Sequence, residues 1–165
     1  MGGTAQRLAA VLLIYMLLHD FLDPRAINLD LTSTSKDAVL GEMVSLLGLD
    51  ERTTMQLGRL LKRREVLGST GVGRGIAIPH CRSLALSRLR LAFGVHRSGL
   101  EYDAVDHQPV HVLFLIVAPP TEVSNQYLPV LGKIAQFAQM PDVADQLTRL
   151  SSPDQLFDLL EQKRV

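Results

Sequence analysis

The side chains best suited to chemistry lie in residues 64–80, where a glycine-rich loop leads into an apolar run and then into Pro79 and His80. Glycine adopts backbone conformations with φ > 0 and lets the chain approach a partner closely, and four glycines fall within residues 68–75. Residues 76–78 are apolar and suit a short buried strand. Proline lacks an N–H and pushes the preceding residue toward extended geometry. We therefore predict that His80 lies at the carboxyl end of that strand, where α/β proteins place their sites.

His80 has the chemistry of a phosphoryl acceptor. Imidazole has an ordinary pKa of about 6.5, so it is mostly neutral and nucleophilic at neutral pH. Phosphoryl transfer passes through a loose transition state, so the protein has to supply position and charge. Ser69, Thr70 and the glycine N–H groups could donate to phosphate oxygens, and Arg64, at the end of a predicted helix, could supply the cation. The residues alone leave a second interpretation open, in which His80 is a buried structural histidine.

Metal binding, nucleotide binding and cysteine catalysis fit the sequence less well. His107 and His111 flank a proline and form no helical pair, and no Cys-x-x-Cys is present, so we expect no metal. The glycines of residues 71–75 lack the spacing of either nucleotide-binding motif and precede a strand, so we expect no nucleotide cofactor, although anion binding by the loop stays open. Cys81 adjoins His80, but neighbours on a strand point to opposite faces, so we interpret it as a bystander thiol.

Length and composition indicate one globular domain. A chain of 165 residues suits a single domain. Seventeen basic and seventeen acidic residues cancel, so no overall field favours nucleic acid or anionic lipid. A single cysteine fits a reducing compartment, and we expect a cytoplasmic protein. Residues 8–18 are apolar but too short to span a bilayer, and no small-residue cleavage site follows them, so we expect neither stable membrane insertion nor secretion.

Hydrophobic periodicity predicts alternating strands and helices. Strands are expected at residues 26–31, 76–78, 89–95 and 110–118, with an edge strand near residues 100–102. Helices are expected at residues 36–47, 51–66, 123–138, 142–150 and 153–162. Thr34 with Asp37 resembles a capping box for the first helix, and Asp50 and Ser152 are the expected N-caps of the second and the last. Strands mixed with helices, and one almost wholly apolar strand, predict an α/β sandwich.

Residues 64–80 resemble the phosphorylation-site signature of phosphotransferase-system IIA proteins of the fructose/mannitol type. The similarity is carried by Arg64-Glu65, Ser69-Thr70, Gly71-Val72-Gly73 and the run Gly75-Ile76-Ala77-Ile78-Pro79-His80. It extends from about Met16 through Leu160. A signature of this length and order is specific.

The resemblance implies a fold, a reaction and partners. The fold is α/β, a mixed β-sheet flanked by helices on both faces. His80 accepts phosphate from the phosphohistidine of a small carrier protein, HPr or its nitrogen-branch counterpart, and Arg64 matches the family's site arginine. The transfer requires no metal ion and no nucleotide.

The sequence departs from the family pattern in two places. Many members carry a second site histidine early in the helix after the central strand, where this sequence has Tyr127. A tyrosine hydroxyl donates a hydrogen bond but carries no positive charge at neutral pH, so we expect slower transfer or a less stabilised phospho-form. Residues 1–15 lie outside the pattern, so we expect a non-family extension there, a single IIA domain over residues 16–165, and Met16 as a candidate translational start.

Three functional interpretations follow from the sequence. No IIB or membrane IIC domain is recognised, which favours a nitrogen-regulatory IIA protein whose phosphorylation state governs its binding to regulatory proteins. The first alternative is a sugar-specific IIA component that passes phosphate to a IIB protein. The second is a protein-binding module that has lost transfer, for which Tyr127 is the only indication.

Overall fold

The computed structural model describes residues 3–8, 16–121 and 126–165. The elements with their bounds are η1 (Leu18–Asp20), β1 (Leu22–Asn28), α2 (Lys36–Ser45), α3 (Glu51–Val66), β2 (Gly71–Gly73), β3 (Ile76–Ala77), β4 (His80–Arg82), β5 (Arg90–Leu100), β6 (Val110–Ala118), α4 (Tyr127–Gln139), α5 (Val143–Thr148) and α6 (Pro153–Lys163). None of the helices within these described ranges has the length and apolar content that crossing a bilayer requires.

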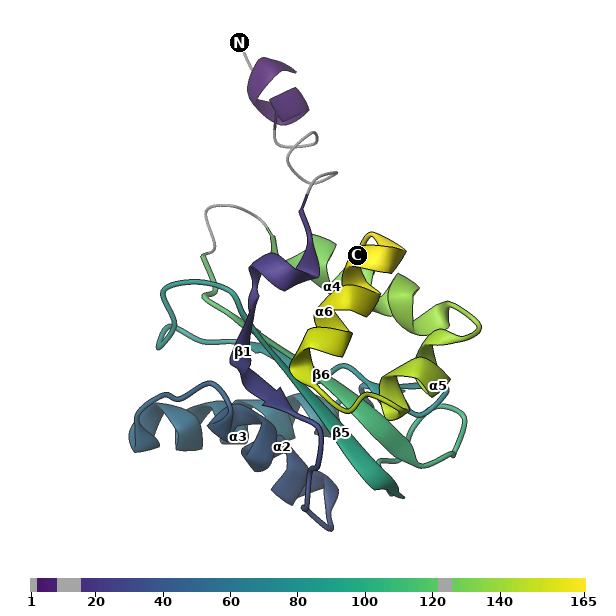
Figure 1. Ribbon diagram of the computed structural model, residues 1–165. Coiled ribbons are helices and arrows are strands. Elements are labelled where there is room, and N and C mark those ends of the chain that lie inside the picture. Colours follow the sequence, from purple (N-terminus) through teal and green to yellow (C-terminus); the bar gives the residue numbers. More distant parts are fainter. Residues whose placement is uncertain (1–2, 9–15, 122–125) are drawn as a thin grey trace.

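The described residues form one six-stranded sheet that mixes parallel and antiparallel pairs. Its order is β1-β5-β6-β3-β2, and β4 also pairs with β6. Strands β5 and β6 are antiparallel, whereas β1 is parallel to β5, and β3 and β4 are parallel to β6. Helices α2 and α3 lie on one face of the sheet and α4, α5 and α6 lie on the other (Figure 1). The predicted α/β fold, a mixed sheet flanked by helices on both faces, is confirmed.

Strands β3 and β4 are two pieces of one path beside β6. Ile76 lies opposite Val112 and His80 lies opposite Ile116, so both pieces keep the same register. Pro79 interrupts the ladder because it has no N–H, but its carbonyl still accepts from the N–H of Ile116 at 3.0 Å. The prediction that the strand ends at His80 is therefore wrong. His80 opens the second piece, and the side chains beyond it continue to alternate between the two faces.

A side-chain hydrogen bond decides where α2 begins, and a glycine turn follows its end. The helix starts where the sequence predicts, but its N-cap is Ser35, whose hydroxyl accepts from the N–H of Ala38 at 3.1 Å, so the box predicted from Thr34 and Asp37 is wrong. The helix ends at Ser45, slightly earlier than predicted, and the chain reverses at Gly48, which has a φ of 64°.

The remaining helices follow the prediction more closely. The predicted caps are confirmed, since Asp50 accepts from the N–H of Thr53 at 2.9 Å and Ser152 accepts from the N–H of Gln155 at 3.3 Å. Helix α4 begins at Tyr127, and the part of its prediction between residues 123 and 125 lies outside the described residues. Its proline falls in the first turn, where no helical N–H is lost.

Strands β1 and β5 differ from expectation, and β1 begins at Leu22, four residues before its predicted start. Strand β1 ends at Asn28, three residues before the predicted end, because the side-chain oxygen of Asn28 accepts from the N–H of Asp30 at 2.9 Å and turns the chain. Strand β5 continues to Leu100, and the described residues contain no separate edge strand near residues 100–102. Tyr102 is instead fully buried.

Each face of the sheet covers its own apolar core. Alternate residues of β6 supply both cores, with Phe114 and Ile116 on the side of α4, α5 and α6, and Leu115 and Val117 on the side of α2 and α3. All four are buried. This double coverage explains why the strand is an almost continuous apolar run.

We expect Gly71→Ala to destabilise the protein. A Cβ at residue 71 would lie 2.7 Å from Cβ and 2.9 Å from Cα of Ala104, and neither atom can rotate away. Overpacking of this kind costs about 1–3 kcal/mol of unfolding free energy, measurable by urea denaturation. Gly58→Ala in α3 is the matched control, because no atom lies within 4 Å of the added Cβ. Alanine in place of a mid-helix glycine gains about 0.5–1 kcal/mol. Equal stabilities of the two variants would contradict this account.

Candidate phosphoryl-acceptor site

One hydrogen bond fixes the half-buried ring of His80. Its Nδ1 lies 2.7 Å from the carbonyl oxygen of Ile78. A carbonyl oxygen only accepts, so Nδ1 carries the proton and donates. In the neutral ring the available lone pair is therefore on Nε2.

Tyr127 and Arg82 lie on the same side of the sheet as His80. Arg82 follows His80 by two residues in β4, so both side chains project from one face. The ring of Tyr127, at the start of α4, meets the His80 ring edge-on, with centroids 6.2 Å apart. The guanidinium carbon of Arg82 lies 4.4 Å from the centroid of the Tyr127 ring, within cation–π range. Burial raises the pKa of Tyr127 to about 12, so its hydroxyl keeps its proton at neutral pH.

Arg64 brings a positive charge to His80 from the last turn of α3. Its Nη1 donates to the carbonyl of Gly68 at 2.9 Å, which orients the guanidinium. Burial is the largest influence on the pKa of His80 and lowers it. The bond to Ile78 opposes that shift, the charge of Arg64 lowers the pKa again, and the charge of Glu65 opposes it. The pKa of His80 falls below its ordinary value of 6.5, so the ring is neutral at neutral pH.

A buried carboxylate, that of Glu65, anchors the end of α3 that carries Arg64. The Glu65 side chain is 6% exposed and pairs with Nζ of Lys36 at 2.8 Å. It also accepts from the N–H of Thr70 and from the hydroxyl of Tyr102, each at 3.1 Å, and from the Thr70 hydroxyl. Nζ of Lys36 lies 4.5 Å from the centroid of the Tyr102 ring. These contacts pair the buried charge and tie α2, α3, the chain before β2 and the chain after β5 together.

Ser69 and Thr70 lie beside this carboxylate, and bonds within the loop engage their hydroxyls. The Ser69 hydroxyl donates to the carbonyl of Tyr102 at 3.3 Å and accepts from the N–H of Gly71 at 3.1 Å. Thr70 is 4% exposed, and its hydroxyl contacts Glu65 and lies 3.1 Å from the Tyr102 hydroxyl. The glycine-rich segment itself forms the β2–β3 hairpin. Of the predicted site residues, the structure brings His80, Arg64 and Tyr127 together, whereas Ser69 and Thr70 brace the loop.

Cys81 points to the opposite face of the sheet from His80. It is buried in the core that α2 and α3 cover, and burial raises the pKa of its thiol to about 12. A thiol that stays protonated is a poor nucleophile, so the geometry agrees with a bystander role.

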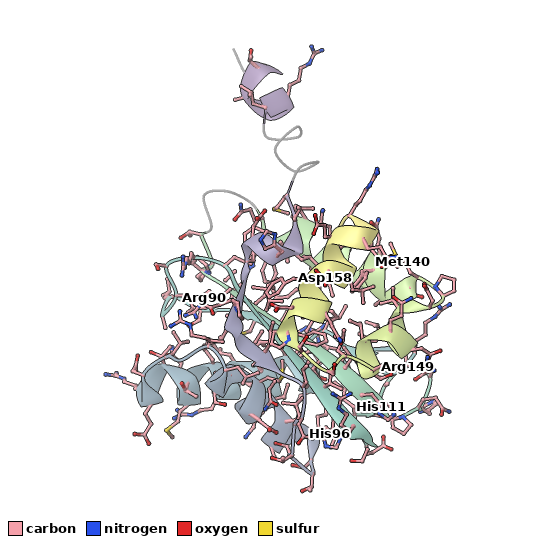
Figure 2. The ribbon with its side chains drawn as sticks, in the orientation of Figure 1. Arg90, His96, His111, Met140, Arg149 and Asp158 are labelled. Atoms are coloured by element: carbon pink, nitrogen blue, oxygen red, sulfur yellow. The ribbon has the colours of Figure 1, made fainter. Side chains whose placement is uncertain are left out.

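The other strand histidines lie away from His80. Nδ1 of His111 is 3.1 Å from the carbonyl oxygen of His96, and the two are close together in Figure 2. His111 precedes Ile116, the partner of His80, by five residues along β6, a separation of about 16 Å. Across the described part of the chain, no three His, Cys, Asp or Glu side chains gather as metal ligands would.

Three residues of the site had no assigned role in the sequence analysis. The signal for Arg82 is available, because a residue two positions after His80 shares its face when the strand continues. Glu65 stands in the family signature without an assigned role. Lys36 gives no signal of its own, since its ion pair depends on how α2 packs against α3.

Comparison with known proteins identifies the family. Residues 20–163 match the family model of the phosphoenolpyruvate-dependent sugar phosphotransferase system, EIIA 2. The chain belongs to this family. It is 32% identical over 146 residues to a nitrogen regulatory protein of Pseudomonas aeruginosa, covering 87% of this chain and 94% of that protein. It is also 32% identical over 152 residues to the fructose-specific EIIABC component of Bacillus subtilis, covering 89% of this chain but only 23% of that protein.

Solved structures support the same assignment. The nitrogen regulatory protein IIA-Ntr of Neisseria meningitidis matches this EIIA chain with a TM-score of 0.77 and 31% identity, covering 86% of this chain and 97% of that one. The IIA mannitol protein of Escherichia coli matches with a TM-score of 0.67 and 19% identity, covering 84% and 97%, which shows a shared fold. The family predicted from residues 64–80 is therefore confirmed.

We expect the pKa of His80 in the folded protein to lie below 6.5, because burial and the charge of Arg64 disfavour the imidazolium. The midpoint is measured from the ring protons in an NMR titration. As the pH falls below 6.5, the unfolded chain takes up the proton first, so this residue lowers stability in acid. Arg64→Gln removes a positive charge and should raise the midpoint, whereas Arg52→Gln, at the far end of α3, should not. A midpoint above 6.5 in the unmodified protein would refute this electrostatic account.

Proposed function

We propose that this protein accepts a phosphoryl group on Nε2 of His80 from the phosphohistidine of an HPr-like carrier, and that its phosphorylation state governs its binding to other proteins. The observation that supports this most directly is the bond from Nδ1 of His80 to the Ile78 carbonyl, which leaves a lone pair on the other nitrogen of a ring flanked by cationic side chains. Membership of the phosphotransferase-system IIA family supplies the reaction class.

The proposed step exchanges one phosphorus–nitrogen bond for another. The lone pair of Nε2 attacks phosphorus as the bond to the carrier's imidazole breaks, and the carrier's imidazole leaves with the electron pair of that bond. The proton on Nδ1 of His80 stays in place, so the product is a positively charged phosphoimidazole ring. The carbonyl of Ile78 stabilises that charge because its bond to Nδ1 becomes charge-assisted.

The proposed phosphate-binding residues are Arg64, Tyr127, Ser69 and Thr70, to which the geometry adds Arg82. Arg64 and Arg82 supply the positive charge that the equatorial oxygens need in a loose transition state. The protonated hydroxyl of Tyr127 supplies a donor in place of the family's second histidine. Ser69 and Thr70 stay predicted as direct donors, and either would have to exchange a present hydrogen bond for one to phosphate.

Similarity to nitrogen regulatory proteins over nearly their whole length favours a regulatory role. A sugar-specific IIA role that passes phosphate to a IIB protein is the second candidate, favoured by similarity to the fructose-specific component of Bacillus subtilis. Mixing the labelled phospho-protein with sugar-specific IIB proteins separates the two. Retention of the label supports regulation, and its passage to a IIB protein supports transport.

We also propose that the family domain spans residues 16–165 and that residues 1–15 are an extension. Met16 and Leu18 support this boundary, because both are buried in the core beneath α4, α5 and α6. A cytoplasmic setting, with no nucleic acid and no stable membrane insertion, stays part of the proposal.

We expect His80→Ala to abolish labelling by the phosphorylated carrier while the protein keeps its fold. Arg64→Ala should slow transfer about a hundredfold or more, because one donor to the developing charge is lost. Transfer is followed with radiolabelled phosphate, and folding by circular dichroism. Arg149→Ala, at the residue that follows α5, is the control and should transfer at the normal rate. Label that persists on His80→Ala would overturn the assignment.

A further inference from the structure

Past its first residue, Glu51, the exposed face of α3 carries only basic charges. Its exposed charged side chains after the first residue are Arg52, Arg59, Lys62 and Arg63. Arg59 and Arg63 are one helical turn apart, where like charges destabilise a helix. A helix face that is merely solvated usually mixes both signs.

These four side chains make no intramolecular polar contact in the described part of the chain. No ion pair and no hydrogen bond reaches their side-chain nitrogens from any described residue. Other arginines are engaged: Arg25 pairs with Asp23 at 2.8 Å, Arg90 donates to Leu47 at 2.8 Å and Arg97 donates to Leu150 at 2.6 Å. The cations of α3 are therefore available to a partner.

The chain has no net charge, but its basic and acidic residues are unevenly distributed along the sequence. Residues 51–90 contain nine basic residues (Lys or Arg) and two acidic residues (Asp or Glu). Residues 1–50 contain three basic and six acidic residues, and residues 91–165 contain five basic and nine acidic residues. The basic segment comprises α3 and the strands around His80. Asp158 on α6 belongs to the acidic part and lies on the opposite layer from α3 (Figures 1 and 2). The charges of the chain are thus segregated along its sequence, with α3 in the basic segment, despite the neutral total.

The C-terminal end of α3 lies toward the site, because the charge of Arg64 acts on His80. Over its 16 residues the helix is about 24 Å long, and its last turn carries Arg64. Val66 and Leu67, at this end, are 86% and 84% exposed, an unusual exposure for large apolar side chains. Arginine is among the residues that are enriched at protein interfaces. A protein that delivers a phosphoryl group to His80 beside Arg64 would also meet Val66 and Leu67, which follow Arg64 within three residues.

We infer that the exposed face of α3, from Arg52 to Leu67, is the docking surface for the phosphoryl-carrying partner, and that this partner presents an acidic face beside its phosphohistidine. This inference rests on the proposed function. The apolar end of the helix packs against the partner next to the transferring group, and the cations farther along attract the acidic face and set its orientation. Transfer is thus steered by charge and falls as salt rises.

The test compares two phosphoryl donors on matched variants. One donor is the phosphorylated HPr-like carrier encoded by the same genome, and the other is phosphoramidate, which is too small to need a docking surface. Arg59→Glu/Arg63→Glu reverses two charges of α3. Arg7→Glu/Arg164→Glu, near the two chain ends, makes the same change in net charge elsewhere. Rates are measured at about 20 mM and about 300 mM salt, where the screening length falls from roughly 20 Å to below 10 Å.

We expect transfer from the carrier to the unmodified protein to fall at least about tenfold between the two salt concentrations. With the carrier as donor, the α3 variant should be at least about tenfold slower at low salt and should lose most of its salt dependence. With phosphoramidate its rate should change less than about twofold, and the same holds for the control variant with either donor.

Carrier transfer that is unaffected or accelerated in the α3 variant overturns the inference. The inference is also overturned if the unmodified protein binds phosphatidylglycerol vesicles or duplex DNA and the α3 variant loses that binding while carrier transfer stays intact. In that case α3 would serve a different partner. Failure of the proposed function gives a separate result, because neither donor would then label His80 in the unmodified protein.

Discussion

The bond between Nδ1 of His80 and the carbonyl of Ile78, two residues earlier in the same chain, is the constraint on which the chemistry of this protein depends. It holds the ring at one angle and assigns the proton to the inner nitrogen, so the outer nitrogen is the nucleophile before any partner arrives. The bond forms because Pro79 interrupts the ladder with β6 without changing its register. The carbonyl of Ile78 is thereby turned toward the ring while the strand path continues on both sides.

The charges around this ring come from parts of the chain that the sheet and one buried carboxylate bring together. Arg82 shares the strand and the face of His80, and Tyr127 closes that face from α4. Arg64 comes from the other layer, and its position depends on Glu65, which is paired and hydrogen-bonded in the interior. Breaking such a buried pair is costly because it leaves an uncompensated charge. A buried ion pair therefore holds one arginine close to a neutral imidazole.

Much of this fold could be predicted from local signals in the sequence. The apolar run of residues 110–118 became β6 with the predicted bounds, and the caps at Asp50 and Ser152 follow from side-chain chemistry within three residues. The errors arose where a neighbour in space decides the outcome. Pro79 was expected to end a strand, but pairing with β6 carries the path through it. The role of Lys36 depends on the packing of α2 against α3, which no local pattern encodes.

The claim that Nε2 of His80 is the acceptor is tested most directly by locating phosphate on the ring. The ¹⁵N-labelled protein, phosphorylated by its carrier, is examined by long-range proton–nitrogen correlation NMR, which distinguishes the two nitrogens. Because Nδ1 donates to Ile78, phosphorus should be bonded to Nε2, with Nδ1 still protonated. Phosphate on Nδ1, or on a residue other than His80, would contradict the account.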